Sequence, residues 1–449
     1  MRNGFATARE SVDAALARID RRNPEINAFT AILHDRARAR ADRLDAARAR
    51  GERMGPLAGV PFAVKNLYDV AGIPTLAGSK INLDRPPAAR DAFLVRQMEA
   101  AGAILVGALN MGEYAYDFTG ENAHYGPSRN PHDPTRISGG SSGGSGAAVA
   151  AGMVPIALGS DTNGSIRVPS SMCGVFGLKP TYGRLSRNGA FLFAASFDHL
   201  GPLALSTADL AAAYDAMQGV DASDPAQSAR EMEPAGAALD DGIGGLRLAV
   251  ADDYFARGAE PVAFEAVARV ADALGIKRRI TIPEAARARA AGFVITAVEG
   301  ANLHAARLKA RPDDFDPATR DRFFTGLMIP GHWYAQAQRF RRWYRDRVAR
   351  LFDDVDVIIA PSAPCTAPAL GQKMMTLAGV EMPVRANLGV FTQPISFIGL
   401  PVVAAPLPKA PGMPIGVQII AAPWREDLAL CVSAALERAG VVASWPVPG

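Results

Sequence analysis

Two glycine- and serine-rich segments carry the residues of this chain that are best suited to chemistry. Residues 137–145 read ISGGSSGGS, and residues 159–167 read GSDTNGSIR. The stretch between them, residues 146–158, predicts a tightly packed helix leading into a short strand, whereas a flexible linker lacks such an apolar middle. Serine hydroxyls held beside closely spaced backbone N–H groups suit a nucleophile with an oxyanion hole.

Other interpretations of these loops stay open on the residues alone. Most glycine- and serine-rich loops are turns or linkers. A phosphate-binding loop requires the pattern Gly-x-x-x-x-Gly-Lys-Ser/Thr, which the sequence lacks. The α/β-hydrolase motif Gly-x-Ser-x-Gly matches formally at Ser141 and Ser142. However, residues 130–135 upstream are polar and interrupted by proline, whereas that motif follows a buried strand.

Lys65 is a candidate for the base that a serine nucleophile needs. It follows the apolar run 60–64 within residues 55–66 (GPLAGVPFAVKN), a pattern that predicts a buried strand with Pro61 near its start. The next acidic residue along the chain is Asp69. A lysine at a strand end usually extends its ammonium group to the surface. If it is desolvated instead, its pKa falls and the neutral amine can act as a base.

The elements that position these residues follow from periodicity. Apolar residues at helical spacing predict helices at 7–23, 36–50, 91–101, 207–218, 260–274, 285–309 and 426–438. Short apolar runs predict strands at 60–64, 103–107, 246–250, 355–360, 402–406 and 415–420. Because strands alternate with helices, we expect an α/β fold with a mixed sheet covered by helices on both faces. No internal repeat is evident.

Taken together, the motifs resemble the amidase signature family. The similarity covers residues 55–66, 102–114, 122–203 and, more loosely, 391–420. Its longest motif begins at the Gly139 loop and ends with residues 173–181, CGVFGLKPT. The resemblance implies the amidase signature fold in a single domain over residues 1–449. The signature core would span about 55–205, and a variable substrate-pocket region about 245–400.

The resemblance also implies a Ser–Ser–Lys triad. Ser165 falls at the family's nucleophile, and Ser141 at the bridging serine that the family holds in a cis peptide. Lys65 falls at the base. A serine hydroxyl is a weak nucleophile, so neutral Lys65 would take its proton through Ser141 and return it to the leaving nitrogen.

The second loop has a further implied role in holding the tetrahedral oxyanion. The backbone N–H groups expected to do so belong to Thr162, Asn163, Gly164 and Ser165. Asp161 and Arg167 match positions that brace this loop, a role compatible with an ordinary buried ion pair. The family usually has glycine or another small residue where Asn163 stands. The side-chain amide of Asn163 would therefore either brace the loop or face the substrate.

Composition limits the class of protein. The 449 residues are 49% hydrophobic, which is ample for the core of a large α/β enzyme. The formal net charge is +3, and the basic residues are scattered except at 339–350, whose amphipathic spacing predicts a solvated helix face. We therefore expect no nucleic acid partner.

The cysteines and histidines point to a reduced protein without a metal. Cys173, Cys365 and Cys431 form an odd, sparse set, which argues against a disulfide framework. Six histidines occur without metal-ligand spacing, so we expect neither a metal nor another cofactor. Since the sequence has no apolar run of membrane-spanning length and no signal-peptide pattern, we expect a cytoplasmic protein without membrane contact.

Three branches of the family compete for the substrate. Residues 110–113 (NMGE) and 121–122 fit the A-type members of the amidotransferases that act with glutamyl-tRNA, and a general small-amide amidase is a second alternative. Residues 114–126, 181–187 and 196–202 are most similar to the branch that hydrolyses 1-carboxybiuret in cyanuric acid (s-triazine) degradation. Residues 387–392 also resemble the pocket of allophanate-hydrolysing members, but these often carry an additional C-terminal domain.

A small, planar, anionic substrate of this kind needs amide partners and a cation. Arginine binds a carboxylate best, and the candidates in the variable region are Arg307, Arg320 and Arg322. Sequence does not choose among them, and each is also compatible with a surface position. Tyr116 and His124 are candidates to reach the substrate amides, or else pack beside the nucleophile loop. The expected reaction is acylation of Ser165 with release of ammonia, followed by attack of water.

The resemblance further implies a partner. Family members in two of these branches pair with a small helical protein that resembles the amidotransferase C subunit, and this partner lies along the enzyme surface. We therefore expect a homodimer within a heterotetramer that contains two copies of each chain. A non-catalytic protein that keeps the fold is the alternative from another class, and intact Lys65, Ser141 and Ser165 argue against it.

Overall fold

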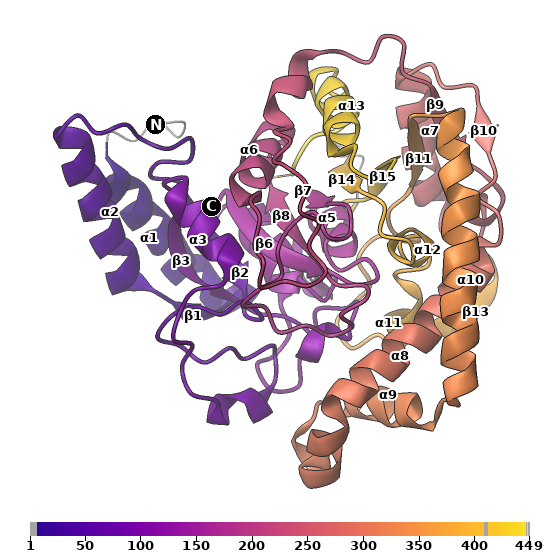
Figure 1. Cartoon of the computed structure of the whole chain (residues 1–449), viewed down its shortest axis with the longest axis horizontal. Helices are drawn as coiled ribbons and strands as arrows, with labels where there is room; N and C mark the ends of the chain where they lie inside the picture. Colours follow the sequence, from indigo (N-terminus) through magenta and orange to yellow (C-terminus); the bar gives the residue numbers. More distant parts are fainter. Residues whose placement is uncertain (1–6, 408–411, 446, 448–449) are drawn as a thin grey trace.

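A single 11-stranded sheet runs through the computed structural model, which describes residues 7–407, 412–445 and 447 (Figure 1). The strand order is β1-β3-β2-β6-β8-β7-β14-β15-β11-β9-β10. These strands are β1 (Phe29–Ile32), β2 (Pro61–Lys65), β3 (Ile104–Leu109), β6 (Ile156–Asp161), β7 (Phe176–Lys179), β8 (His199–Ala204), β9 (Leu248–Ala251), β10 (Arg279–Ile280), β11 (Val357–Pro361), β14 (Val402–Pro406) and β15 (Gly416–Ala421).

The sheet is mixed, as expected. Strands β3, β2 and β6 are parallel neighbours, and so are β11, β9 and β10. The strands between these two groups pair in antiparallel fashion. Two small hairpins lie outside the main sheet: β4 (Arg129–Asn130) with β5 (Asp133–Ile137), and β12 (Met374–Leu377) with β13 (Val380–Pro383). The strand directly before Ser141 is β5 of a small hairpin and not a buried strand of the main sheet, which excludes the α/β-hydrolase context.

Helices lie on both sides of this sheet (Figure 1). They are α1 (Ala8–Ile26), α2 (His34–Ala49), α3 (Phe93–Ala100), α4 (Gly143–Ala150), α5 (Arg167–Cys173), α6 (Thr207–Met217), α7 (Pro261–Ala273), α8 (Ala285–Ala310), α9 (Pro317–Met328), α10 (Gly331–Ala349), α11 (Val384–Asn387), α12 (Gln393–Ser396) and α13 (Glu426–Arg438). The first begins at a capping box, in which the Thr7 hydroxyl and the Glu10 carboxylate satisfy each other's backbone N–H groups.

Strand β2 packs against two different apolar clusters, one on each of its faces. Phe62 and Val64 belong to a large apolar cluster, whereas Ala63 between them belongs to a second cluster with α1, α2 and α4. Successive side chains of a strand point to opposite faces, so the apolar run is buried on both. All the helices and strands predicted from periodicity occur, with ends displaced by a few residues. Helix α4 begins at Gly143, within the first glycine-rich loop.

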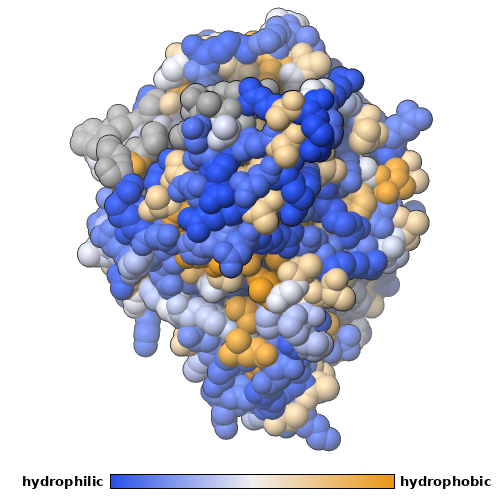
Figure 2. Space-filling view, turned by 90° about the vertical axis from the view of Figure 1, so that its left-hand side faces the viewer, coloured by the Kyte–Doolittle hydropathy of each residue, from blue (hydrophilic) through white to orange (hydrophobic). Residues whose placement is uncertain are grey.

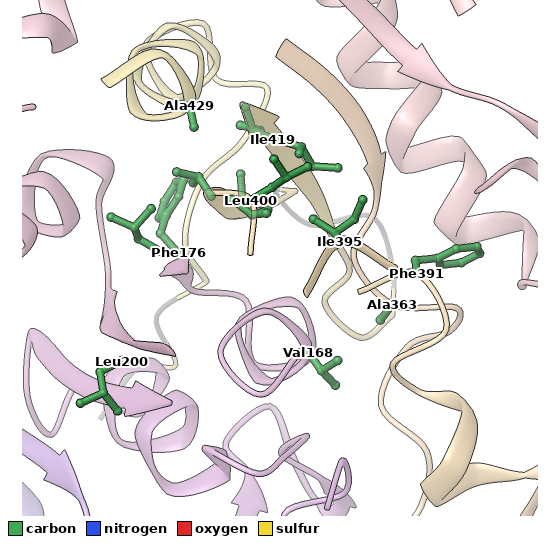
Figure 3. Close-up of a cluster of buried hydrophobic side chains, with 14 of the residues drawn as sticks. Val168, Phe176, Leu200, Ala363, Phe391, Ile395, Leu400, Ile419 and Ala429 are labelled. Atoms are coloured by element: carbon green, nitrogen blue, oxygen red, sulfur yellow. The ribbon is translucent and has the colours of Figure 1, made fainter. Parts of the chain in front are cut away.

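The second glycine-rich loop is held by packing around α5. Figure 3 shows Val168 of this helix in a cluster with Phe391 and Ile395, which come from the C-terminal half of the chain. This contact brings residues 387–396 against the loop 161–166 that enters α5. The site is therefore built by segments more than two hundred residues apart.

No helix of the described residues is both long and apolar enough to cross a membrane. On the side of the molecule seen in Figure 2, the surface is mostly hydrophilic, with hydrophobic residues gathered in a narrow band.

Candidate active site

Lys65 is enclosed by three serine hydroxyls. It ends β2 with no exposed surface, and its Nζ lies 2.7 Å from Ser141 Oγ, 2.9 Å from Ser160 Oγ and 3.1 Å from Ser142 Oγ. Asp69, the nearest acid in sequence, instead accepts a hydrogen bond from Thr75. Among the residues that the structure describes, the amine thus has hydroxyl partners but no bonded carboxylate.

Burial controls the protonation of this amine. It lowers the pKa of Lys65 to about 7, although the negative charges of Asp198, Asp161 and Asp117 oppose that shift. A lysine with a pKa near neutrality is partly in the free amine form and can accept a proton. The arrangement is suited to a general base.

The three serine hydroxyls around Lys65 differ in whether they already donate a hydrogen bond to another group. Ser142 Oγ accepts a hydrogen bond from the backbone N–H of Ser160 at 3.2 Å and donates one to the carbonyl oxygen of Ser160 at 3.1 Å. Its proton is therefore engaged. The hydroxyls of Ser141 and Ser160 remain free to donate to a neutral Nζ, so either can pass a proton to the amine.

The two glycine-rich loops meet beside this cluster. The peptide bond between Gly140 and Ser141 is cis, and the backbone N–H of Ser142 donates to the carbonyl oxygen of Ser165 at 3.3 Å. Ser165 is 2% exposed and stands two residues before α5. No hydrogen bond joins its hydroxyl to Ser141 in the described part of the chain. Such contacts often tighten only when substrate is bound.

A buried ion pair braces the second loop. Arg167 donates to both carboxylate oxygens of Asp161 at 2.9 Å, and both residues are fully buried. Burial opposes the charge of Asp161, yet the guanidinium holds the pKa of this carboxyl well below its usual value. Arg167 also donates to Gln418 Oε1 at 2.6 Å and to the carbonyl oxygen of Thr392 at 3.1 Å.

We expect Arg167→Met to destabilise the protein by about 3–5 kcal/mol, because Asp161 would keep its charge in the interior without a partner. Urea denaturation at pH 7 measures the change. Arg247→Met is the control, since its pair with Asp356 is partly solvent-exposed and pairs near the surface contribute little. Equal effects of the two substitutions would contradict the bracing role of the buried pair.

A further acid lies behind the loop. Asp198 Oδ1 accepts the Thr162 hydroxyl at 2.5 Å, and its Oδ2 accepts the backbone N–H groups of Phe193 and Ala194 at 2.6 and 3.0 Å. Burial raises the pKa of Asp198 to about 6, against the lowering effect of these hydrogen bonds. The side chain of Thr162 is thereby fixed beneath the loop.

Asn163 is held through its backbone but not through its side chain. Its carbonyl oxygen accepts the Thr392 hydroxyl at 2.6 Å. Its side-chain Oδ1 is buried and has no hydrogen-bond partner among the described residues. The side-chain oxygen therefore makes no hydrogen bond that would brace the loop.

Of the candidates for substrate contacts, the structure brings Tyr116 and Arg322 to the Ser141 side of the site. Arg322 donates to the carbonyl oxygen of Tyr116 at 2.7 Å and lies over its ring, 3.6 Å from the centroid. Asp117, the next residue, accepts a hydrogen bond from Arg385 at 2.7 Å. A Cβ added to Gly140 would lie 2.8 Å from Asp117 Oδ2, so this carboxylate packs on the loop that carries Ser141.

The other candidates lie in different surroundings. His124 Nε2 is 2.9 Å from Glu113 Oε1, in a network that also holds Thr319. Arg307 packs over the Phe191 ring. Arg320 pairs with Asp313 and Asp321 on the surface of α9. None of the three contacts Lys65 or its serines.

Sequence reasoning assigned no catalytic role to several residues that the fold delivers to the site: Ser142, Ser160, Asp117, Asp198, Thr392 and Arg385. Of these, Thr392 lies in the 387–392 segment that resembles a family pocket. Ser142 and Ser160 lie within or beside the motifs and carried a usable signal, namely a hydroxyl next to a predicted catalytic group. Within residues 7–407, 412–445 and 447, no three His, Cys, Asp or Glu side chains are grouped so as to hold a metal ion.

Comparisons with known proteins show the family of this chain. The amidase family profile matches residues 10–430. AtzE of Pseudomonas sp. (strain ADP), which is a 1-carboxybiuret hydrolase subunit, is 55% identical over 441 residues, covering 98% of this chain and 96% of that protein. The A component of the glutamyl-tRNA(Gln) amidotransferase of Chloroflexus aurantiacus is 37% identical, with 97% and 94% covered.

Solved structures give the same result. One described as a vestigial protein complex revealing the origins of an s-triazine catabolic enzyme superposes with a TM-score of 0.97 at 55% identity, covering 98% of this chain and 97% of that one. A 6-aminohexanoate cyclic dimer hydrolase superposes with a TM-score of 0.85 at 31% identity, with 98% and 95% covered. The predicted fold is confirmed by these similarities.

Proposed function

Because this chain belongs to the amidase signature family and is an amide hydrolase, we propose that its substrate is 1-carboxybiuret. The observation that carries the proposal is the 55% identity to AtzE, which belongs to a 1-carboxybiuret hydrolase, over nearly the whole length of both chains. The enclosed Lys65 and its serines support the hydrolytic chemistry. The reaction would belong to s-triazine degradation.

The proposed mechanism starts from neutral Lys65. The amine takes the proton of Ser141, which takes that of Ser165, and Ser165 Oγ attacks the terminal carbonyl carbon of the substrate. The proton then returns by the same route to the leaving nitrogen, and ammonia departs. Water attacks the acyl-serine with the same base, which frees the carboxylated product and restores Ser165.

The oxyanion would be stabilised by the backbone of the second loop. The N–H groups proposed for this role belong to Thr162, Asn163, Gly164 and Ser165. The Asp161–Arg167 pair and the Thr392–Asn163 hydrogen bond keep the loop in place before substrate arrives. Donors fixed in advance contribute more than donors that must reorganise, about 3–4 kcal/mol each.

Among the candidates for the substrate carboxylate, Arg322 has the most suitable surroundings. It is half-buried, and it bonds to a backbone carbonyl rather than to a carboxylate. Burial lowers the pKa of Arg322, because a positive charge away from water is unfavourable when no anion is bonded to it. Tyr116, whose carbonyl oxygen Arg322 binds, directly precedes Asp117, and the Asp117 carboxylate packs on the loop that carries Ser141. An incoming carboxylate would complete the pair.

We expect Arg322→Gln to lower kcat/KM for 1-carboxybiuret about 10- to 100-fold, because a charge-assisted hydrogen bond is lost. The value for uncharged biuret should change less than about threefold. Arg320→Gln is the matched control: it lies on the same helix but pairs with surface aspartates. Steady-state ammonia release measures all three proteins, and an equal loss on both substrates would contradict the assignment.

We also propose that the enzyme works with a small helical partner, as a homodimer within a heterotetramer. Support comes from the complex described for its structural relative. Large hydrophobic side chains are also exposed on α8, α9 and α10: Leu303, Phe324, Leu327, Met328 and Trp333. Light scattering after co-expression with such a partner tests the composition.

The three free, buried cysteines fit a reducing cytoplasm.

The decisive experiment for the substrate is ammonia release with and without that partner. The test substrate is 1-carboxybiuret generated in situ, compared with biuret, allophanate, malonamide and glutamine. Selective turnover of 1-carboxybiuret would support the proposal. Turnover of glutamine alone, rising with tRNA and ATP, would replace it with the amidotransferase function, and broad turnover would leave a general amidase.

A further inference from the structure

The carboxylate of Asp117 holds the turn at residues 117–120 together. Its Oδ1 accepts hydrogen bonds from the backbone N–H of Thr119 at 3.0 Å and from the Thr119 hydroxyl at 2.8 Å. Its Oδ2 accepts one from the backbone N–H of Gly120 at 2.6 Å. The side chain has no exposed surface, and Arg385 of α11 donates to Oδ1 at 2.7 Å. Charge-assisted bonds to both oxygens of a buried carboxylate keep this turn in one conformation.

This turn packs directly on the loop that carries Ser141. A Cβ added to Gly140 would lie 2.6 Å from the Gly120 nitrogen and 2.8 Å from Asp117 Oδ2. One added to Gly120 would lie 2.6 Å from the carbonyl oxygen of Gly139. Only glycine fits at these two positions, because the backbones of the turn and the loop touch without space for a side chain. The turn therefore fixes the residues directly before Ser141.

Phe118 of the same turn packs on the loop that carries Ser165. A Cβ added to Gly164, the residue before Ser165, would lie 3.3 Å from Phe118 Cε1. The ring also leaves no room for a side chain at Gly389, where a Cβ would lie 2.3 Å from Phe118 Cζ. Residues 117–120 thus touch both glycine-rich loops at positions next to the two serines of the triad.

The separation of the two serine hydroxyls depends on such packing. The backbone N–H of Ser142 donates to the Ser165 carbonyl oxygen, but among the described residues no hydrogen bond joins the hydroxyls of Ser141 and Ser165. Proton transfer needs the two oxygens at hydrogen-bond distance, and a misplacement of about 1 Å can lower a rate about 100-fold. The elements that pack on both loops therefore bear directly on the rate.

We propose that Asp117 is a positioning residue of the proton relay, because it holds the 117–120 turn that sets the separation of Ser141 and Ser165. Arg385 supports it by pairing with the carboxylate. Neither side chain exchanges a proton with the substrate in this role. The inference rests on the proposed triad, but it does not depend on which amide is hydrolysed.

Asp117→Asn is the primary variant, since it keeps the shape of the side chain and removes the charge and one acceptor. We expect kcat to fall about 30-fold without a rise in KM, because the relay acts after the substrate is bound. The substrate is the one that gives the fastest ammonia release. Measurement at about pH 9 keeps Lys65 neutral in both proteins, so the effect of the Asp117 charge on the Lys65 pKa does not enter.

A double-mutant cycle with Ser141→Ala tests whether Asp117 acts through that serine. In the Ser141→Ala protein, followed by single-turnover ammonia release, Asp117→Asn should lower the rate less than about threefold, because the relay is already lost. An equal loss in both backgrounds would overturn the proposal and leave the triad standing. Full turnover by Ser141→Ala alone would instead overturn the triad, and the inference with it.

Arg385 gives a second test from the edge of the turn, where its side chain is 25% exposed and folding is at less risk. Arg385→Gln should lower kcat about tenfold, and Arg385→Lys should restore it to within about threefold because the charge returns. Unchanged kcat in Arg385→Gln together with Asp117→Asn would contradict the positioning role.

Asp91→Asn is the matched control. The Asp91 carboxylate also pairs with an arginine that is 25% exposed, Arg36, and also accepts a backbone N–H, from Ala71. This pair joins α2 to the segment before α3. We expect Asp91→Asn to keep kcat within about twofold. A fall equal to that of Asp117→Asn would show that loss of any such pair slows the enzyme, and the special role of Asp117 would be wrong.

Discussion

Replacing Ser165 with alanine is expected to lower kcat/KM for amide hydrolysis by at least about 10⁴-fold. The substitution removes the proposed nucleophile, and Lys65 and Ser141 then have no hydroxyl to activate. Because the residue is small and buried, we expect Tm to change by no more than about 3 °C. Ammonia release and thermal unfolding measured on the same preparation check the two parts of the prediction.

Ser145→Ala is the control for this experiment. Ser145 is a fully buried serine of the first glycine-rich loop, and its hydroxyl donates to the Leu158 carbonyl oxygen at 3.1 Å. We expect it to lose stability but to retain turnover within about tenfold. Retained turnover in Ser165→Ala would place the nucleophile on another serine, with Ser160 as the next candidate because of its contact with Lys65.

Lys65→Met is expected to lower kcat/KM about 10³- to 10⁴-fold, since the base is lost while the space is filled. The unsubstituted enzyme should gain activity as pH rises through about 7, where Lys65 loses its proton. That rise should be absent from the residual activity of the variant. A pH–rate profile between about 5 and about 9 tests both, because these limits lie about two pH units on each side of 7.

The same substitution has an opposite effect on stability. Burial lowers the pKa of Lys65 from 10.5 to about 7, so the unfolded chain binds this proton more readily than the folded chain. The unsubstituted protein therefore loses stability as pH falls from 10.5 to about 7, and the variant loses less, because Lys65 no longer contributes and Lys179 still does. We expect Lys65→Met to be the more stable protein at pH 7, as measured by urea denaturation.

Lys179→Met is a matched control for the lysine. Burial also lowers the pKa of Lys179 to about 7, but this amine donates to the backbone carbonyl groups of Leu400 and Pro180. We expect its loss to leave the rise of activity near pH 7 in place. If that rise vanished in Lys179→Met and persisted in Lys65→Met, the assignment of the base would be wrong.

Local pattern predicted the elements around this site, whereas the roles of Lys65, Ser141 and Ser165 were implied by the resemblance to the family. The apolar run before Lys65 predicts a buried strand, and the glycine density of the two loops predicts close backbone approach; both occur. Two of the three acids whose negative charge opposes the fall in the Lys65 pKa were not predictable in that way. Asp117 and Asp198 come near the base from segments about 50 and 130 residues further along, through tertiary packing that has no local signal.

The choice among the arginines illustrates the same limit. Arg320 and Arg322 are two residues apart, so on a helix they point in different directions. In α9, Arg320 meets surface aspartates, whereas Arg322 turns toward the Tyr116 backbone. The register of α9 against the rest of the molecule decides which of them is available. That register depends on long-range contacts that α9 makes with α8 and with residues 113–116.

The hydrogen bonds of Arg167 to Thr392 and Gln418 also bear on when the enzyme becomes active during synthesis. Both catalytic loops leave the ribosome well before residue 418, but the ion pair that braces the second loop is then still without its C-terminal partners. A nascent chain should therefore not hydrolyse amides until β15 has been inserted between β14 and β11. Only completely synthesised chains would thus hydrolyse amides in the cell.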